Sequence, residues 1–125
     1  MDVTASVVHV VGSEHTARAV GSGDLEVLGT PVVLAWCEEA TCAALTLPDH
    51  ATSVGVRVAL EHLAASAIGS TVTATATGRL DDDGRRAELV VEATDETGRL
   101  LARGTVVRAV VDRERFLARV PAVEE

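Results

Sequence analysis

The sequence predicts an α+β domain in which an antiparallel β-sheet is wrapped around one long central helix. Two observations carry this prediction: a long apolar run that opens with a helix-start signal, and later segments in which apolar residues recur at every second position. The chain has 125 residues, of which 47% are hydrophobic, so it can build one core but has no room for a second domain. Residues 1–125 are therefore expected to form a single domain.

The first element is a strand from Met1 to Val11, which contains five valines and ends at Gly12. The stretch from Ser13 to Asp24 is small, polar and rich in glycine, which is typical of a connecting loop. The lone Gly-x-Gly within it is too weak a signal to predict a nucleotide-binding loop.

The central helix is predicted to begin at Thr30, because a threonine can cap the first backbone N–H groups and Pro31 fits the first helical position. It should run to about Thr46, since Pro48 cannot continue the ladder of backbone hydrogen bonds. Apolar residues surround nearly the whole circumference, which predicts a helix covered on all sides by other structure.

Strands are predicted in four segments after this helix. Val54, Val56, Val58, Leu60 and His62 alternate with the intervening residues and should share one face of the first strand. The following strands are expected over Gly69 to Leu80, Ala87 to Ala93 and Leu100 to Val111, with turns at Asp83-Gly84 and at Asp95 to Gly98. Strands joined by such short turns form an antiparallel meander, which would wrap the helix.

Three positions in this arrangement could carry chemistry. The alternation directs His62 inward, where a histidine is more often a hydrogen-bonded core residue than a catalyst. Glu38 and Glu39 interrupt the apolar helix, and a buried carboxylate is costly unless it is paired, solvated or protonated. At least one should line a cavity or interface and could act as base or nucleophile. Alternatively, one meets solvent and the other pairs with an arginine such as Arg57, and the local pattern does not distinguish the two acids.

Thr30 is the third position, at the start of the helix. Its simplest role is that of a helix cap. Unpaired N–H groups and the helix dipole favour negative charge there, so a nucleophile or an oxyanion site is the alternative.

Several short motifs occur in a fixed order along the chain. Gly29-Thr30-Pro31 is followed by Glu38 in CEEA, and Ser53-Val54-Gly55-Val56 leads to His62 in EHLAASAIG. Gly69 to Ala74, the strand from Gly104 to Val110 and the tail Asp112 to Phe116 complete the set. In order and spacing, this set resembles the fluoroacetyl-CoA thioesterase family of the hot-dog fold, over about Val20 to Phe116.

The resemblance implies a hot-dog domain that pairs as a homodimer, with the site at the subunit interface; a tetramer is equally compatible. It implies that Thr30, Glu38 and His62 are the catalytic residues, and it selects Glu38 over Glu39. Gly55 corresponds to a glycine near the thioester carbonyl, and Gly29 is assigned to substrate binding with it.

One departure from the family bears on the substrate. The fluoroacetyl-specific member has an aromatic lid residue shortly before its catalytic threonine, whereas Val20 to Gly29 contains no aromatic residue here. We therefore expect hydrolysis of a short acyl-CoA or related thioester without strict selection for fluorine. No metal or organic cofactor is expected, because CoA is part of the substrate. The alternatives are a non-catalytic module that binds an acyl group or a hydrophobic small molecule, and a structural dimerisation domain with a Glu38–His62 ion pair.

Composition argues against several other classes of protein. A net charge of −8 and only two aromatic residues make a nucleic-acid partner improbable. Glu38 and Glu39 shorten the longest apolar run below the roughly 20 residues of a membrane span, and the N-terminal segment lacks the basic flank of a secretory signal. A cytoplasmic location is therefore expected. Cys37 and Cys42 point apart on the helix and predict neither a disulfide nor a zinc site. All eleven basic residues are arginines, and the sequence does not reveal which of them would contact CoA.

Overall fold

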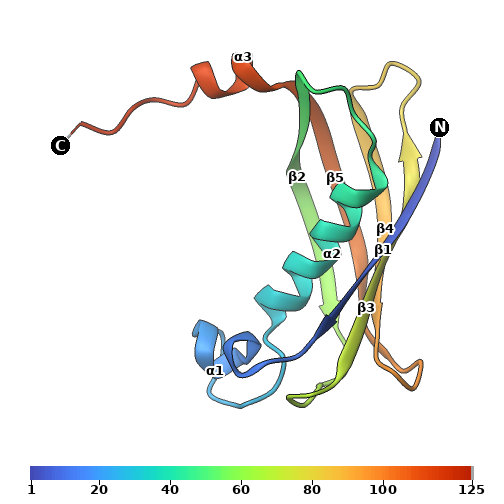
Figure 1. Ribbon diagram of the computed structural model, residues 1–125, viewed down its shortest axis with the longest axis vertical. Helices are drawn as coiled ribbons and strands as arrows, with labels where there is room; N and C mark the ends of the chain where they lie inside the picture. Colours follow the sequence, from blue (N-terminus) through green and yellow to red (C-terminus); the bar gives the residue numbers. More distant parts are fainter. Residues whose placement is uncertain (125) are drawn as a thin grey trace.

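The computed structural model describes residues 1–124 and has the α+β architecture that the sequence predicts. In chain order the elements are β1 (Asp2–Val10), the 3-10 helix η1 (Ser13–His15), α1 (Ala17–Val20), α2 (Thr30–Ala44), β2 (Ala51–His62), β3 (Thr71–Leu80), β4 (Arg86–Thr94), β5 (Leu100–Asp112) and α3 (Arg113–Ala118). Figure 1 shows α2 lying across one face of the sheet.

The strands form one antiparallel sheet in the order β1-β3-β4-β5-β2. The predicted meander is confirmed for β3, β4 and β5, which are neighbours in both sequence and space. Both predicted turns are correct: Gly84 and Gly98 have φ angles of 71° and 83°, in the left-handed region that glycine adopts without a steric penalty. β1 and β2 are left as the two edges of the sheet.

The core lies between α2 and the middle of the sheet. As the alternation predicts, β3 and β4 turn their apolar residues toward the helix, and each of them is at most 1% exposed: Val72, Ala74, Ala76, Ala87, Leu89, Val91 and Ala93. Most of these residues are alanines, which allow the helix backbone to approach the sheet closely. Val33, Cys37 and Ala40 fill the helix side of this interface and are fully buried.

The prediction of a helix covered on all sides is wrong for the single chain. α2 packs mainly against β1 and β3 and makes fewer contacts with β2, β4 and β5. Its buried residues form one stripe, and Ala35, Glu39 and Cys42 are exposed. One sheet can cover only one face of a helix, so the remaining apolar surface stays open. The helix also ends at Ala44, before Thr46, because Leu45 is already extended.

The stretch predicted as a loop after β1 contains short helical turns. The hydroxyl of Thr16 accepts the backbone N–H of Ala19 at 3.1 Å and caps α1, and Gly21 ends that helix with a φ of 79°. At the other end of the chain, the carboxylate of Asp112 accepts the backbone N–H of Arg115 at 3.0 Å and starts α3. α3 and the segment after it extend away from the sheet past β2 (Figure 1).

A β-bulge interrupts β2 and corrects the predicted alternation. Gly55 pairs with Arg108 and Arg57 pairs with Val107, so Val56 has no partner on β5. The extra residue reverses the phase: Gly55 faces α2 on one side of the bulge, and Leu60 and His62 face the helix region on the other. Val54 and Val56 therefore do not share a continuous face with His62.

The structure also bears on the two cysteines of α2 and on whether a helix could span a membrane. Cys37 is buried, Cys42 is exposed, and both are free thiols, as the sequence predicts. Burial, together with the neighbouring charge of Glu38, raises the pKa of the Cys37 thiol to about 11. In the part of the chain from 1 to 124, every helix is too short or too polar to cross a bilayer.

Candidate active site

Thr30 and His62 meet at the N-terminal end of α2. The Thr30 Oγ1 lies 2.7 Å from the His62 Nδ1, which is hydrogen-bonding distance. The sequence left open whether Thr30 caps the helix, and the structure gives that position to Gly29, with no side-chain cap. The Thr30 hydroxyl is thus directed to the histidine on β2.

The surroundings of His62 favour the neutral form of its imidazole. Burial lowers the pKa of its imidazole below the usual 6.5. A backbone hydrogen bond with Ala64 raises the pKa and partly offsets that shift. When Nδ1 accepts the Thr30 hydroxyl proton, the ring proton lies on Nε2. The Nε2 atom is buried and has no hydrogen-bond partner among the described residues. A buried polar atom of this kind marks a place where a substrate, a water or another side chain belongs.

A cavity of about 300 Å³ opens beside this pair and is called the Thr30–His62 cavity. Small and apolar residues from α1, the loop before α2 and the segment after β2 line the rest of it: Ala17, Ser22, Val27, Leu28, Leu63, Ala64 and Ala65. Apart from His62, the lining carries no ionisable side chain, so the cavity suits an uncharged acyl group more than a charged one.

Glu38 lies farther along α2, on the side that faces β2. Its Oε2 is 3.7 Å from the Nη1 of Arg108, and its side chain is 35% exposed. A Cβ atom built on Gly55 would lie 2.9 Å from the same oxygen, so only glycine lets β2 pass this carboxylate without displacing it.

Arg108, which lies beside Glu38, was not identified from the sequence as a residue of the site. It is 6% exposed, and its guanidinium donates to the hydroxyl and the carbonyl of Ser53 at 2.8 and 3.0 Å. The signal in the sequence was an arginine inside the apolar run from Val106 to Val111, where a charge needs a partner. Arg108 therefore provides fixed positive charge beside Glu38.

Glu39 lies on the side of the helix that faces β1. Its carboxylate pairs with the His9 Nε2 at 2.5 Å, and the His9 ring stacks on Trp36 with 4.7 Å between ring centroids. The His15 ring meets the edge of the same indole at 5.0 Å. These contacts join β1 and η1 to α2, and they give Glu39 a packing partner far from His62.

The structure thus brings together two of the three predicted catalytic residues. Thr30 and His62 are in contact, whereas Glu38 is eight residues further along the helix, which is about 12 Å along its axis. Of the predicted substrate-binding glycines, Gly55 lies beside Glu38. Gly29 is buried, and its N–H donates to the carbonyl of His15 at 2.9 Å.

The sequence profile of a family described as fluoroacetyl-CoA-specific thioesterase matches residues 11–114 of the chain. Among solved structures, the fluoroacetyl-CoA thioesterase FlK is 30% identical, with a TM-score of 0.84 over 94% of this chain and 91% of FlK. Variants of FlK have been solved in complex with acetyl-CoA and with fluoroacetate and CoA. A sequence search of curated proteins finds no match.

Two other solved structures are similar over most of their length. A hypothetical protein of Thermus thermophilus, described as a thioesterase superfamily member, is 25% identical, with a TM-score of 0.83 over 92% of this chain and 85% of that one. A hot-dog-like protein from Thermanaerovibrio acidaminovorans is 28% identical, with a TM-score of 0.79 over 96% and 92% of the two chains. These matches confirm that the sheet and α2 form a hot-dog fold.

Proposed function

The chain belongs to the fluoroacetyl-CoA-specific thioesterase family, and from this membership we propose that it hydrolyses a short acyl-CoA thioester at Thr30 and His62. The observation that carries the proposal is the 2.7 Å contact between the Thr30 hydroxyl and the His62 Nδ1. A nucleophile and a base within hydrogen-bond reach of each other are the minimal set for acyl transfer. CoA enters as part of the substrate, and the reaction needs no other cofactor.

His62 is suited to carry the proton in both directions. The lowered pKa keeps the imidazole neutral near pH 7, so its Nδ1 can take the proton of the Thr30 hydroxyl as that oxygen attacks the carbonyl. The same proton can then pass to the sulfur of the leaving thiolate. Water, activated in the same way, would release the acid from the threonine.

The developing negative charge on the carbonyl oxygen needs an N–H donor at the start of α2. Pro31 has no N–H, and those of Val32 and Val33 both donate to the Gly29 carbonyl, at 3.0 and 3.1 Å. The Thr30 amide has no such partner within residues 1–124. We assign the oxyanion position to that amide, at the positive end of the helix dipole.

The acyl group would occupy the Thr30–His62 cavity. Its lining offers no aromatic side chain to close over the acyl chain. The site therefore suits short acyl groups in general, fluorinated or not, and lacks a feature that would select fluoroacetyl alone.

We further propose that two chains pair through β2. This edge strand leaves its outer backbone groups unpaired, and Val56 and Val58 on it are 52% and 39% exposed. The helix face toward β2 also lacks cover in the single chain. Antiparallel pairing of two β2 strands would extend the sheet and cover both surfaces.

The same pairing would give Glu38 its place in the site. Glu38 lies beside Gly55, which is seven residues before His62 on β2. If the two-fold axis passes near Val58, Gly55 of one copy lies opposite His62 of the other. Glu38 of the second copy could then accept a hydrogen bond from the His62 Nε2, the atom that has no partner in the described part of the single chain.

Thiol release from a panel of short acyl-CoAs tests the activity. The wild-type protein should turn over at least one of them, and His62→Ala and Thr30→Ala should each lose on the order of 10²-fold or more in kcat. His9→Ala is the matched control, because it removes a histidine from the opposite side of α2. Tight binding of the thioesters without turnover would instead support a non-catalytic binding module, and it would refute the proposal.

Mixed dimers test the arrangement across the interface. Glu38→Gln and His62→Ala chains, each of low activity alone, are mixed, unfolded and refolded together. One site of each mixed dimer then has His62 from one chain and Glu38 from the other, so about half of the wild-type activity per mixed dimer should return. Mixtures no more active than the separate variants would overturn the assignment of Glu38 to the partner's site.

A further inference from the structure

The Thr30–His62 cavity does not provide for the charged end of CoA. An acyl-CoA carries several phosphate groups on its nucleotide, and phosphates in proteins are met by cations or helix N-termini. The lining of this cavity has no arginine. With a net charge of −8, the surface of the protein also repels phosphate in general. A CoA thioester therefore needs a local concentration of cations elsewhere.

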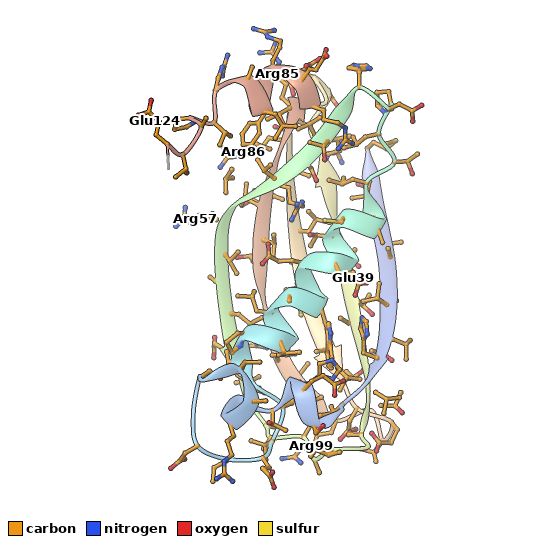
Figure 2. The ribbon with its side chains drawn as sticks, turned by 60° about the vertical axis from the view of Figure 1, so that its left-hand side comes forward. Glu39, Arg57, Arg85, Arg86, Arg99 and Glu124 are labelled. Atoms are coloured by element: carbon orange, nitrogen blue, oxygen red, sulfur yellow. The ribbon has the colours of Figure 1, made fainter. Side chains whose placement is uncertain are left out.

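Such a concentration occurs where β5 passes into α3. A groove of about 430 Å³ is lined by Arg85, Val111, Asp112, Arg115, Phe116 and Arg119, and is called the arginine groove. Figure 2 shows Arg85 at the end of the molecule where α3 leaves the sheet. Its volume lies within the range of sites that hold small molecules of nucleotide size.

The three arginines of this groove are available to a ligand. Within residues 1–124, no carboxylate lies within 4.0 Å of the guanidinium of Arg85, Arg115 or Arg119. The one acid in the lining, Asp112, already accepts the Arg115 backbone N–H at 3.0 Å as the cap of α3. Three guanidinium groups that line one groove without a carboxylate within 4.0 Å repel each other, and an anion between them reduces that repulsion.

The groove also has a fixed wall and an aromatic surface. Arg113 does not line it; its guanidinium donates to the carbonyls of Asp49 and Ala51 at 3.5 and 3.2 Å and ties α3 to the start of β2. Phe116, one of only two aromatic residues in the chain, is 37% exposed and offers a ring face on which a base can stack. Cations and an aromatic face together match a phosphorylated nucleoside.

Distance excludes use of the arginine groove by the active site of the same chain. β2 runs from Ala51, beside α3, to His62, and its twelve residues span roughly 36 Å. The pantetheine arm of CoA is comparable to an extended peptide of about five residues and spans roughly 17 Å. One CoA molecule cannot reach both places in one chain.

A second copy removes this difficulty. In an antiparallel β2 pair, the Ala51 end of one strand lies beside the His62 end of the other. α3 and the segment after it project past the β2 edge in both views, toward the space that the second copy would occupy (Figures 1 and 2). The groove of one copy would then lie near the Thr30–His62 cavity of the other.

We propose that the arginine groove of one chain binds the phosphorylated nucleotide of a CoA thioester whose acyl group lies at Thr30 and His62 of a second copy. The proposal rests on the proposed thioesterase activity and on pairing through β2. It assigns the cationic contacts of CoA to Arg85, Arg115 and Arg119, with Phe116 as the stacking surface.

Substrates with and without the nucleotide give the first test. The triple variant Arg85→Gln, Arg115→Gln, Arg119→Gln should raise KM for an acyl-CoA by on the order of tenfold or more, because it removes charge-assisted hydrogen bonds. Its kcat/KM for the corresponding acyl-pantetheine, which has no nucleotide, should equal that of wild type. Arg18→Gln is the control, since Arg18 adjoins Ala17 of the cavity and is the rival cation. Equal losses on both substrates, or a KM effect in Arg18→Gln alone, would overturn the proposal.

Binding of the nucleotide itself is measured independently of turnover. Calorimetry with adenosine 3′,5′-bisphosphate should show binding to wild type and at least a tenfold weaker Kd for the triple variant, with native circular dichroism in both. Equal affinity in the two proteins would overturn the assignment of the groove. A protein that binds the nucleotide but hydrolyses no thioester would refute the proposed function and leave the groove assigned.

Mixed dimers show which copy uses the groove. His62→Ala chains, with an intact groove, are refolded together with triple-variant chains, which have an intact Thr30–His62 pair. Use of the groove by the other copy predicts that the mixed dimers hydrolyse acyl-CoA with the wild-type KM at one of their two sites. A KM that stays at the value of the triple variant would show that the groove does not serve the second copy.

Discussion

The two edges of the sheet carry the same kinds of residue in different settings. At the β1 edge, His9 stacks on Trp36 and pairs with Glu39, so a histidine and an acid are used to fasten the strand to α2. At the β2 edge, His62 contacts Thr30, while Glu38 lies with Arg108 and Gly55. The β1 pair is complete within one chain, whereas His62 retains a buried nitrogen without a partner among residues 1–124. Residue type alone therefore does not distinguish a structural pair from a reactive one; a buried hydrogen-bonding atom that is still without a partner does.

Adjacent acids on α2 give the largest expected contrast between the edges. Glu38→Gln should lower kcat for acyl-CoA hydrolysis by about 10²-fold, because it removes the carboxylate that we propose to act on the partner's His62. Glu39→Gln changes the same functional group one residue away, on the side of β1, and kcat should stay within about twofold of wild type. Steady-state kinetics of both variants measure this, and equal losses would contradict the division between the two sides.

Charge placed on each edge gives the next contrast. Val58→Arg on β2 should convert the proposed dimer to monomer and reduce activity by roughly tenfold or more, because an unpaired charge at the proposed interface is costly. Val8→Arg on β1 is the control, since Val8 is 61% exposed on the other edge. Analytical ultracentrifugation and thiol release are measured on the same samples. A Val58→Arg protein that remains dimeric and active would show that β2 is not the interface.

The pH dependence of activity distinguishes the two histidine sites. We propose neutral His62 as the base, and burial lowers its pKa from 6.5, so kcat/KM should hold at pH 6.5 and fall about tenfold per pH unit only once the pH is below the shifted pKa. Removal of His9 should leave that profile unchanged. A profile whose acid limb lies above pH 6.5 would show that a different group, or a His62 with a raised pKa, controls the reaction.

The smallest expected effect is on the stability of the β1 edge. His9→Ala removes the stacked ring and the Glu39 partner, and it should lower the free energy of unfolding by about 1 kcal/mol without loss of activity. Trp36 is the only tryptophan, so its fluorescence reports the loss of the stack directly. Urea denaturation of His62→Ala gives the comparison, and an activity loss in His9→Ala would show that the β1 edge also takes part in the reaction.

The fold was largely predictable because its signals are local. Pro31 and the apolar run placed the start of α2 at Thr30, and the glycines at 84 and 98 placed both turns. The short helix α1 was missed because its cap, Thr16, lies in a stretch whose composition is typical of loops. The uncovered side of α2 could not be foreseen from one chain, since an apolar surface in the sequence does not reveal which molecule covers it.

The site was predictable only in part. The resemblance supplied Thr30, Glu38 and His62, and the residues alone supplied an inward histidine and two anomalous acids. That Thr30 contacts His62 instead of capping α2 depends on tertiary packing between segments 32 residues apart. Arg108 was not singled out, because a charge inside a valine-rich strand shows its function only when its partners Ser53 and Glu38 are in place.

The bulge at Val56 has a consequence for how this strand tolerates insertion and deletion. Gly55 and His62 are an odd number of residues apart, so in an uninterrupted strand they would point in opposite directions. Removing Val56 would bring Gly55 and His62 to an even spacing, so a regular strand would still direct both toward α2 and would keep the pairing with β5 on either side. Removing a residue between Val58 and His62 would instead turn His62 away from Thr30. Loss of a residue should therefore be tolerated at the bulge and not in the part of β2 that leads from it to His62.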